Sequence, residues 1–461
     1  MFREMRDIET ESQKTVTNIA FHPVKPIMAM SIKKSNVSTL SEPADASKDE
    51  VWSYNFESSE WSPKAIQYDF QVSCLIFHSY PGMILLVAGL KDGSINMIKE
   101  GADGLFIHGC VSHITHRHRS FISRVECHPV KPLLLSCSHS LFIDRGEIKM
   151  WNIQVTGSRL QIILLSKISS SELSVPDNIG RLLGNFRHLN VDAVFHPIEP
   201  LIVTSNMDGG AITNLWRYDD APPNNVSYVS SLERPNASIY KTSSRPFNPY
   251  ETFISCIAID PKSSIFACDD GPIVNLYKLN SGQPNFEQIG ILNPPAPLRE
   301  FIVASIIFHP SLDIIAVIYK SKPVPPRYTY SRSYYIQISK LGGDMTKIPQ
   351  RTFTIEPPTS YESLLERDFN SEKEFLFHFH PQLPIFAVIL KSDDGSNKLN
   401  VKMFSIDMSP VPSPPPIEEV NGGGRKYSKS KLKSVSKKRR SRSKKRNHRH
   451  RTMKHRRKHM K

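Results

Sequence analysis

The 461-residue sequence lacks the features that mark secreted, membrane-spanning and disulfide-stabilised proteins. Its six cysteines show no CxxC spacing, and in a chain of this length we expect reduced, mostly buried side chains. The longest apolar runs, at 83–90 and 160–165, are too short to cross a bilayer. The charged start, MFREMRDIETES, has no apolar signal-peptide core. We therefore expect a soluble intracellular protein, in the nucleus or the cytoplasm, without membrane contact.

The motifs of common catalytic and cofactor sites are also absent. The sequence has no GxGxxG at a strand–helix junction, no GxxxxGKS/T phosphate loop, no HExxH and no GxSxG. One cluster, HGCVSHITHRH at 108–118, has spacings that permit metal ligation. We favour a strand running into a loop there over a metal site. No cofactor is predicted, and an enzyme is the least favoured class of function.

Acidic residues are missing from the C-terminal end, which changes the meaning of the formal net charge of +15. Residues 425–461 contain 20 of the 59 Lys and Arg residues and no Asp or Glu. The other 39 basic residues stand against 44 acidic ones, so the rest of the chain carries a net charge of −5. All of the excess basicity therefore belongs to the tail.

Composition divides the chain into three parts. Frequent proline, with 35 residues, favours many turns and few long helices in the folded region, 1–407. Residues 408–424, MSPVPSPPPIEEVNGGG, form a Pro-rich and then Gly-rich linker. Residues 425–461 are expected to be disordered, because a block of like charges cannot bury apolar surface.

One phrase recurs seven times in the folded region: an apolar run, a turn that usually contains His-Pro, and a second apolar run. Two copies are VTNIAFHPVKPIMAM at 16–30 and VDAVFHPIEPLIVTS at 191–205. Each copy predicts a hairpin, in which the recurring His or Asp is a turn residue. A third strand-like segment follows each copy, such as LWRY at 215–218, and a fourth usually comes next, such as LQIILLSKI at 160–168. Seven units of four short strands predict an all-β, seven-bladed propeller.

These repeats resemble the WD-repeat family. The fourth copy, NMDGGAITNLWRY at 206–218, has the Asp-Gly turn and the Trp that ends the third strand, and His118 and Trp151 match the family in the third copy. The resemblance implies a buried hydrogen-bond network that is structural. Carried over, its members are His188, Ser205, Asp208 and Trp216 in the fourth copy and His118, Ser136 and Trp151 in the third. The role of Asp144 in the third copy is left open.

The two ends of the repeat array predict how the ring closes. The last repeat has no fourth strand before the linker, whereas the N-terminus has residues to spare. We therefore expect residues 3–10 to form the outer strand of the last blade, beside 401–406, since closure protects open sheet edges.

The extra length of the repeats falls between second and third strands and between fourth and first strands. In a propeller both kinds of connection emerge on one face, and insertions on one face commonly mark the binding side. Two insertions are rich in Tyr and Arg, which dominate binding hot spots. The candidate partner-binding residues are Arg234, Tyr240, Arg245, Tyr250, Arg327, Tyr328, Tyr330 and Arg332. The alternative is a pair of disordered surface loops without a binding role.

The tail predicts electrostatic binding to polyanions. Its candidate residues are Lys437, Lys438, Arg439, Arg440, Arg442, Lys444, Lys445 and Arg446. Tyr427 is its only aromatic residue, so contacts with nucleic acid would neutralise phosphates without stacking on bases. The leading hypothesis is a non-catalytic, monomeric scaffold whose propeller binds a protein or peptide, while the tail supplies nuclear targeting or affinity for DNA, RNA or an acidic partner. The alternative is a nucleic-acid-binding protein in which the tail is the main functional element.

Overall fold

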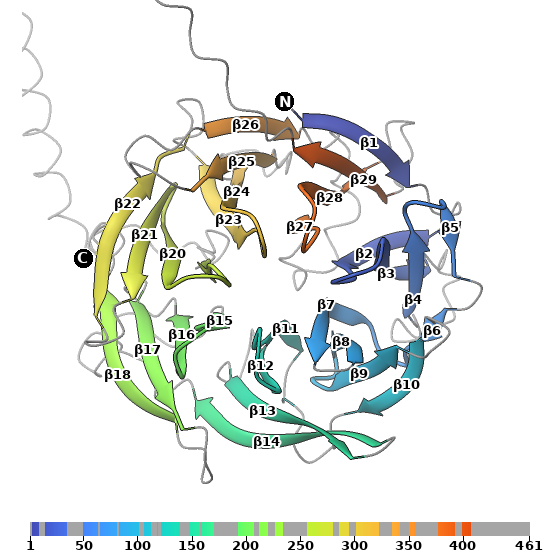
Figure 1. Cartoon of the computed structure of the whole chain (residues 1–461), viewed down its shortest axis with the longest axis horizontal. Helices are drawn as coiled ribbons and strands as arrows, with labels where there is room; N and C mark the ends of the chain where they lie inside the picture. The colour runs from blue at the N-terminus through green and yellow to red at the C-terminus, as the bar shows by residue number, and fades with distance from the viewer. Residues whose placement is uncertain are drawn as a thin grey trace, which may run out of the picture. The chain divides into compact units, whose positions relative to one another are not determined.

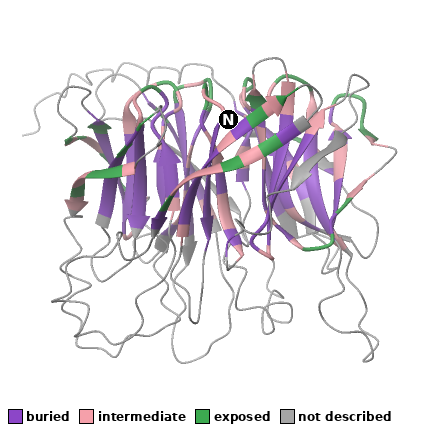
Figure 2. Cartoon of the chain, turned by 90° about the horizontal axis from the view of Figure 1, so that it is seen from below, coloured by how far each residue is buried: buried purple, intermediate pink, exposed green. Residues whose placement is uncertain are grey.

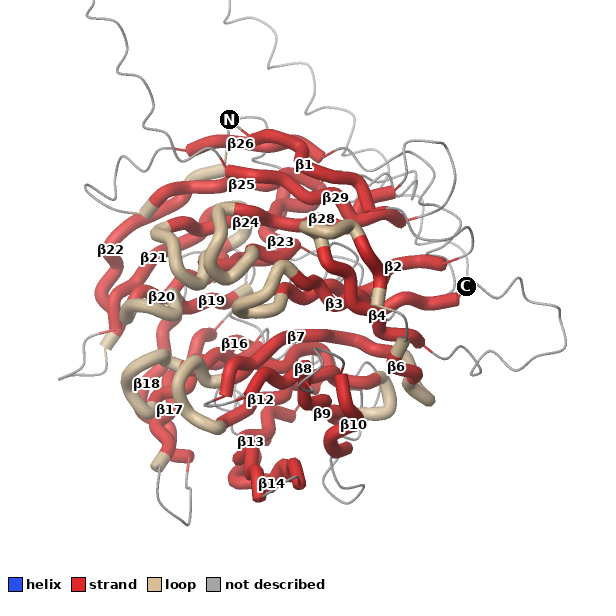
Figure 3. The backbone as a smooth tube through the Cα atoms, turned by 45° about the vertical axis from the view of Figure 1, so that its right-hand side comes forward, coloured by secondary structure: helices blue, strands red, loops and turns tan. Residues whose placement is uncertain are grey.

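A computed structural model describes most of the strands and tight turns of this chain. The described residues are 2–8, 14–34, 49–62, 65–80, 83–100, 106–111, 118, 121–138, 147–156, 159–169, 192–206, 212–219, 226–233, 256–279, 285–294, 301–321, 334–341, 350–355, 377–391 and 399–406. Every regular element among them is a β-strand (Figure 3). The chain divides into Met1–Met408 and Ser409–Lys461, and the fold described below is that of the first unit.

Seven sheets follow one another around a central axis (Figure 1). Blade 1 contains β2 (Lys14–Phe21), β3 (Ile27–Lys34), β4 (Asp49–Asn55), β5 (Glu60–Trp61) and β6 (Ile66–Gln67). Blade 2 contains β7 (Val72–Tyr80), β8 (Met83–Leu90), β9 (Ile95–Glu100) and β10 (Phe106–Val111). Blade 3 contains β11 (Ile122–Cys127), β12 (Leu133–Ser138), β13 (Glu147–Thr156) and β14 (Arg159–Ser169). Blade 4 contains β15 (Asp192–Phe195), β16 (Leu201–Asn206), β17 (Ile212–Tyr218) and β18 (Val226–Glu233).

The remaining blades repeat the same order of strands. Blade 5 contains β19 (Ile257–Ile259), β20 (Ile265–Asp270), β21 (Ile273–Leu279) and β22 (Phe286–Leu292). Blade 6 contains β23 (Phe301–Phe308), β24 (Ile314–Ser321), β25 (Tyr334–Lys340) and β26 (Gln350–Ile355). Blade 7 contains β27 (Phe377–Phe379), β28 (Ile385–Lys391), β29 (Leu399–Ile406) and β1 (Phe2–Ile8). The predicted all-β, seven-bladed propeller is therefore confirmed.

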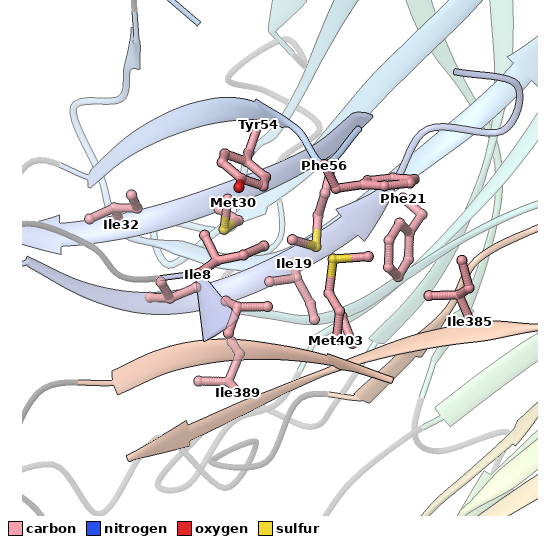
Figure 4. Close-up of a cluster of buried hydrophobic side chains, with 14 residues drawn as sticks. Ile8, Ile19, Phe21, Met30, Ile32, Tyr54, Phe56, Ile385, Ile389 and Met403 are labelled. Carbon is pink, nitrogen blue, oxygen red and sulfur yellow. The ribbon is translucent and has the colours of Figure 1, made fainter. Parts of the chain in front are cut away.

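The N-terminal strand closes the ring, as predicted. β1 pairs antiparallel with β29, from Phe2 opposite Ile406 to Ile8 opposite Val401. Ile8 is buried in a cluster that joins blade 7 to blade 1 (Figure 4). The first and last strands of the propeller thus share one sheet.

The core of the propeller is split into layers between neighbouring blades. The described residues form seven hydrophobic clusters, and each combines side chains from two adjacent sheets. Strands in the middle of a blade are covered on both faces, so both sets of alternating side chains are buried. In β12, LLLSCS, all six residues are buried and most of them are apolar. A single blade therefore cannot bury its own apolar surface.

The antiparallel strand order gives the propeller two different faces. The first and second strands of a blade meet at a short turn on one face, the turn face, where segments such as 22–26 and 196–200 lie. The second strand ends and the third begins on the opposite face, the loop face, where fourth strands also end. Figure 2 shows exposed turn residues along one edge of the propeller in side view.

A histidine organises five of the seven turns between first and second strands. The Nδ1 atom of His196 accepts hydrogen bonds from the backbone N–H groups of Ile198 and Glu199, at 3.2 and 2.9 Å. Its own backbone N–H donates to Leu201 O across the turn, at 2.9 Å. The same pair of Nδ1 contacts is made by His22, His128, His309 and His380. Because Nδ1 accepts two N–H groups, the ring must be neutral and carry its proton on Nε2.

Blade 5 has an aspartate at the equivalent position. Asp260 Oδ1 accepts the backbone N–H of Lys262 at 3.2 Å, and Oδ2 accepts the hydroxyl of Ser263 at 2.6 Å. Both kinds of turn thus need a side chain that accepts the backbone N–H of the residue two positions later. A histidine or an aspartate can supply that acceptor.

Three of the turn histidines also contact the next blade. His22 packs edge-on against Phe77 of blade 2, with ring centroids 5.2 Å apart, and His128 packs against Phe195 of blade 4 at 5.1 Å. His309 packs against Phe379 of blade 7 and donates from Nε2 to Leu383 O at 2.9 Å. These contacts join blade 1 to blade 2, blade 3 to blade 4 and blade 6 to blade 7 on the turn face.

Removal of residues 1–12 should lower the melting temperature markedly. The deletion takes away β1, leaves the outer edge of β29 unpaired and exposes part of the cluster around Ile8. Thermal unfolding followed by circular dichroism measures the change. An unchanged melting temperature would show that closure by β1 contributes little to stability.

Two substitutions of His196 should show how much its acceptor atom contributes to the free energy of unfolding. His196→Ala leaves two backbone N–H groups without their acceptor, at about 1–3 kcal/mol of unfolding free energy. His196→Asn supplies a neutral oxygen at the place that Asp260 fills in blade 5, so it should cost clearly less. Urea unfolding of both variants at pH 7.5 measures the difference, and equal losses would contradict this account of the turn.

A comparison of the wild type with His196→Asn tests how the stability of the fold depends on pH. Burial lowers the pKa of His196 to about 4, from an ordinary value of 6.5. Between those values the unfolded chain binds a proton that the folded chain does not, so stability is full above pH 6.5 and falls as the pH drops toward 4. Each such histidine contributes a slope of about 1.4 kcal/mol per pH unit. Stability of the His196→Asn variant should therefore decline less steeply than that of the wild type over this range.

Candidate functional site

The predicted network residues of the third repeat meet in one hydrogen-bonded chain on the loop-face side of blade 3. Trp151 Nε1 of β13 donates to Ser136 Oγ of β12 at 2.8 Å, and Ser136 Oγ lies 2.6 Å from His118 Nε2. All three side chains are buried. Since the serine oxygen accepts from the indole, its hydroxyl proton is free to be donated to the imidazole.

A carboxylate that sequence reasoning missed lies next to this chain without a hydrogen bond to it. Glu147, the first residue of β13, places Oε2 3.7 Å from His118 Nδ1. Its two carboxylate oxygens also lie 3.4 Å from Lys149 Nζ and 2.5 Å from Lys167 Nζ. Asp144, whose role was left open, lies outside the described residues. The signal in the sequence was an acidic residue four positions before Trp151, at the start of the strand.

Histidine 118 is held neutral in this environment. Its burial, together with the positive charges of Lys149 and Lys167, lowers its pKa well below the ordinary value. A neutral imidazole can accept from Ser136 at Nε2, while its Nδ1 makes no hydrogen bond and lies 3.7 Å from Glu147 Oε2. Within the 108–118 segment, this is the one His or Cys whose side chain is described, and its Nε2 is occupied by the serine contact.

In the fourth repeat the structure corrects one residue. Trp216 Nε1 donates to Thr204 Oγ1 at 2.9 Å, so Thr204, and not Ser205, is the partner of the indole. Ser205 stands opposite Thr213 in β17, whereas Thr204 stands opposite Asn214. Neighbouring residues of a strand point to opposite faces, and a register error of one residue therefore selects the wrong side chain. His188 and Asp208 lie outside the described residues.

The central channel carries a charged cluster that the sequence analysis did not single out. Arg124 of the innermost strand β11 donates to Asp192 Oδ2 of blade 4 at 2.7 Å and to Glu126 Oε2 at 3.1 Å. Its Nη1 also reaches Ile257 O of blade 5, at 3.3 Å. Burial lowers the pKa of Arg124, but the carboxylates of Asp192 and Glu126 more than offset it, and the pKa is raised.

This cluster joins the inner strands of blades 3, 4 and 5. The guanidinium spans the inner strands of three consecutive blades, and its charge is matched by two carboxylates at hydrogen-bond distance. Burial raises the pKa of Glu126, against the opposing effect of Arg124. An arginine that is already engaged in this way has little capacity to bind a further anion.

The candidate partner-binding residues in the Tyr- and Arg-rich insertions, and the candidate residues of the tail, all lie outside the described residues. The strands that flank the two insertions are described. β18 ends at Glu233 and β19 begins at Ile257, while β24 ends at Ser321 and β25 begins at Tyr334. All four strand ends lie on the loop face, so both insertions are attached to the same face of the propeller.

Two chemical properties of the described region bear on function. No group of three or more His, Cys, Asp or Glu side chains there is arranged to hold a metal ion. Likewise, the described part of the chain has no helix of the length and apolarity needed to span a membrane.

The fold is a seven-bladed β-propeller, and its His–Ser–Trp chain resembles the structural network of WD-repeat proteins. Among solved structures, the chain is similar to Chaetomium thermophilum Sqt1 bound to the N-terminus of the ribosomal protein L10. Identity is 13%, the TM-score is 0.50, and the match covers 87% of this chain and 90% of that one. It is also similar to the RRP9 WD40 repeats, with 13% identity, a TM-score of 0.48 and coverage of 87% and 97%. No protein-family model and no curated protein matches the sequence.

Loss of the serine acceptor should cost more than loss of the threonine acceptor. Ser136→Ala removes the partner of both Trp151 and His118, whereas Thr204→Val removes only the partner of Trp216. Each orphaned buried group costs about 1–3 kcal/mol, so the alanine variant should be the less stable of the two. Urea unfolding measures both, and equal losses would mean that the His118 contact contributes nothing to stability.

Proposed function

We propose that this protein is a non-catalytic scaffold that binds a protein or peptide on the loop face of its propeller. The observation that carries the proposal is the sorting of connections: the long insertions are attached to loop-face strand ends, whereas the turns between first and second strands stay short. The Sqt1 structure, of the same fold, is bound to the N-terminus of a ribosomal protein. A protein segment is the kind of partner we propose here.

The residues proposed to bind this partner are the Tyr and Arg side chains of the two insertions. Tyrosine provides a large contact area with little conformational freedom to lose, and arginine provides several hydrogen-bond donors. The polar side chains of the described network have a structural role, since Ser136 bonds to His118 and accepts from Trp151 inside the propeller. These side chains therefore offer no catalytic group to a substrate.

We propose that residues 425–461 bind polyanions and contribute nuclear targeting. The support is the presence of 20 Lys and Arg residues and no acidic residue in this segment. The rest of the chain, with a net charge of −5, gives no general attraction for phosphate. The second candidate function, a nucleic-acid-binding protein whose tail is the main element, rests on the same segment.

The Tyr/Arg insertions can be tested by replacement with serine. Substitution of the eight candidate residues should abolish recovery of at least one specific partner from cell extract, in the presence of nuclease, because hot-spot side chains carry most of the binding energy. Mass spectrometry of proteins recovered with the full chain measures this. The matched control replaces Phe70, Ile163 and Ile291, which are exposed outside these insertions. Retention of every partner would show that the insertions are not the binding surface.

The tail can be tested by separating it from the propeller. A fusion of residues 425–461 to an inert carrier should bind DNA and RNA alike at low salt. If it neutralises about six to ten phosphates, its affinity should fall by on the order of 10³–10⁵ between about 50 and 200 mM salt. Fluorescence anisotropy measures both. A fragment of residues 1–407 should show neither behaviour, and full affinity in that fragment would place the binding surface on the propeller.

A further inference from the structure

The turn between β27 and β28 in blade 7 is joined to blade 6 by a hydrogen bond between blades. His380 begins this turn, and its Nδ1 atom accepts the backbone N–H groups of Gln382 and Leu383, at 3.1 and 3.0 Å. The carbonyl oxygen of Leu383 accepts a hydrogen bond from His309 Nε2 of blade 6 at 2.9 Å. The same leucine thus connects the turn histidines of two consecutive blades.

On its other side, the ring of His380 packs against blade 1. Its centroid lies 5.3 Å from that of Phe21, at the end of β2, and 5.8 Å from that of Phe56, just after β4. Figure 4 shows both phenylalanines in the cluster that joins blade 7 to blade 1, together with Ile8 of the closing strand β1. His380 therefore lies at the blade that closes the ring, between its two neighbours.

These contacts require a neutral imidazole at His380. Protonation of Nδ1 removes the lone pair that accepts two backbone N–H groups, so the turn loses both hydrogen bonds. The turn then no longer holds Leu383 O in place for His309. Burial lowers the pKa of His380 to about 4, from an ordinary value of 6.5, and the positive charges that His309 and His22 gain on protonation lower it further.

The charged groups around His380 do not offset a positive charge there. In the described part of the chain, no carboxylate bonds to this imidazole. On the blade 1 side, the adjoining turns carry Lys25, which pairs with Glu100 of blade 2, and Glu57, which is exposed. On the blade 6 side, Asp313 pairs with a lysine of blade 5. A protonated His380 therefore gains no ion pair from the described contacts on either side.

We propose that the turn at His380 is an acid-sensitive junction of the ring. Protonation of His380 separates the turn-face side of blade 7 from blades 6 and 1, while the remaining blades stay packed together. Because β1 pairs with β29 in this same blade, the ring opens where the first and last strands of the propeller meet. Opening exposes the apolar surface around Phe21 and Ile385, which is buried in the closed ring.

Hydrogen–deuterium exchange of the full chain, followed by mass spectrometry, measures the opening of each blade separately. Opening at blade 7 frees two turn histidines, His309 and His380, whereas opening at blade 4 frees His196. Protection of the amides in β27 and β28, corrected for the intrinsic effect of pH, should therefore fall more than protection in β15 and β16. The excess loss should be about tenfold between about pH 7 and about pH 5, because one additional proton is bound on opening.

Two matched variants separate this junction from the acid sensitivity of the whole fold. His380→Asn supplies an acceptor oxygen that does not titrate in this range, at the position where Asp260 serves in blade 5. It should abolish the excess loss of protection in blade 7. His196→Asn makes the same change in blade 4 and should leave that excess in place.

Two results would overturn the proposal. One is an equal loss of protection in blades 7 and 4 of the wild type, which would mean that the ring has no preferred place of opening. The other is an undiminished excess in His380→Asn, which would assign the acid sensitivity of blade 7 to another group. The comparison of blades in the wild type needs no variant, so it decides the question even if His380→Asn does not fold.

Discussion

Each sheet of this propeller has two apolar faces, and neither can be covered from within the sheet. The middle strands of a blade are buried on both sides, so every blade depends on two neighbours. An open row of such sheets would leave the outer faces of its first and last members in water. The ring solves this, and the pairing of β1 with β29 joins its ends through a sheet that both termini share. The packing of blade 7 against blade 1 depends on that closure.

Two sets of polar contacts hold neighbouring blades in the arrangement that a closed ring requires. On the turn face, a neutral histidine accepts two backbone N–H groups and packs against the next blade. In the channel, Arg124 bridges inner strands of three blades while two carboxylates balance its charge. Both sets of contacts give directional hydrogen bonds, to Nδ1 of the histidines and from the guanidinium of Arg124, which apolar packing alone does not provide. Adjacent blades are consequently held in a defined order and spacing.

The antiparallel strand order then separates two different faces of the propeller. Strand ends on the loop face tolerate long connections, because a chain that leaves and re-enters there disturbs no turn. On the turn face the connections between first and second strands are short, and the blades differ there in single side chains such as Val24 and Lys262. The blades thus differ from one another in the length of their connections on the loop face and in single side chains on the turn face.

The sequence by itself determined the repeat number, the strand order and the way the ring closes, because these depend on local patterns of apolar runs, turns and spare terminal residues. It also identified His118, Ser136 and Trp151, whose hydrogen-bonded contact the structure describes. The tertiary structure alone decided which neighbours meet. Thr204 replaced Ser205 because pairing with β17 sets which residue faces Trp216, and Glu147 reached His118 across strands. Such register and packing relations join residues far apart in the chain, and no local pattern encodes them.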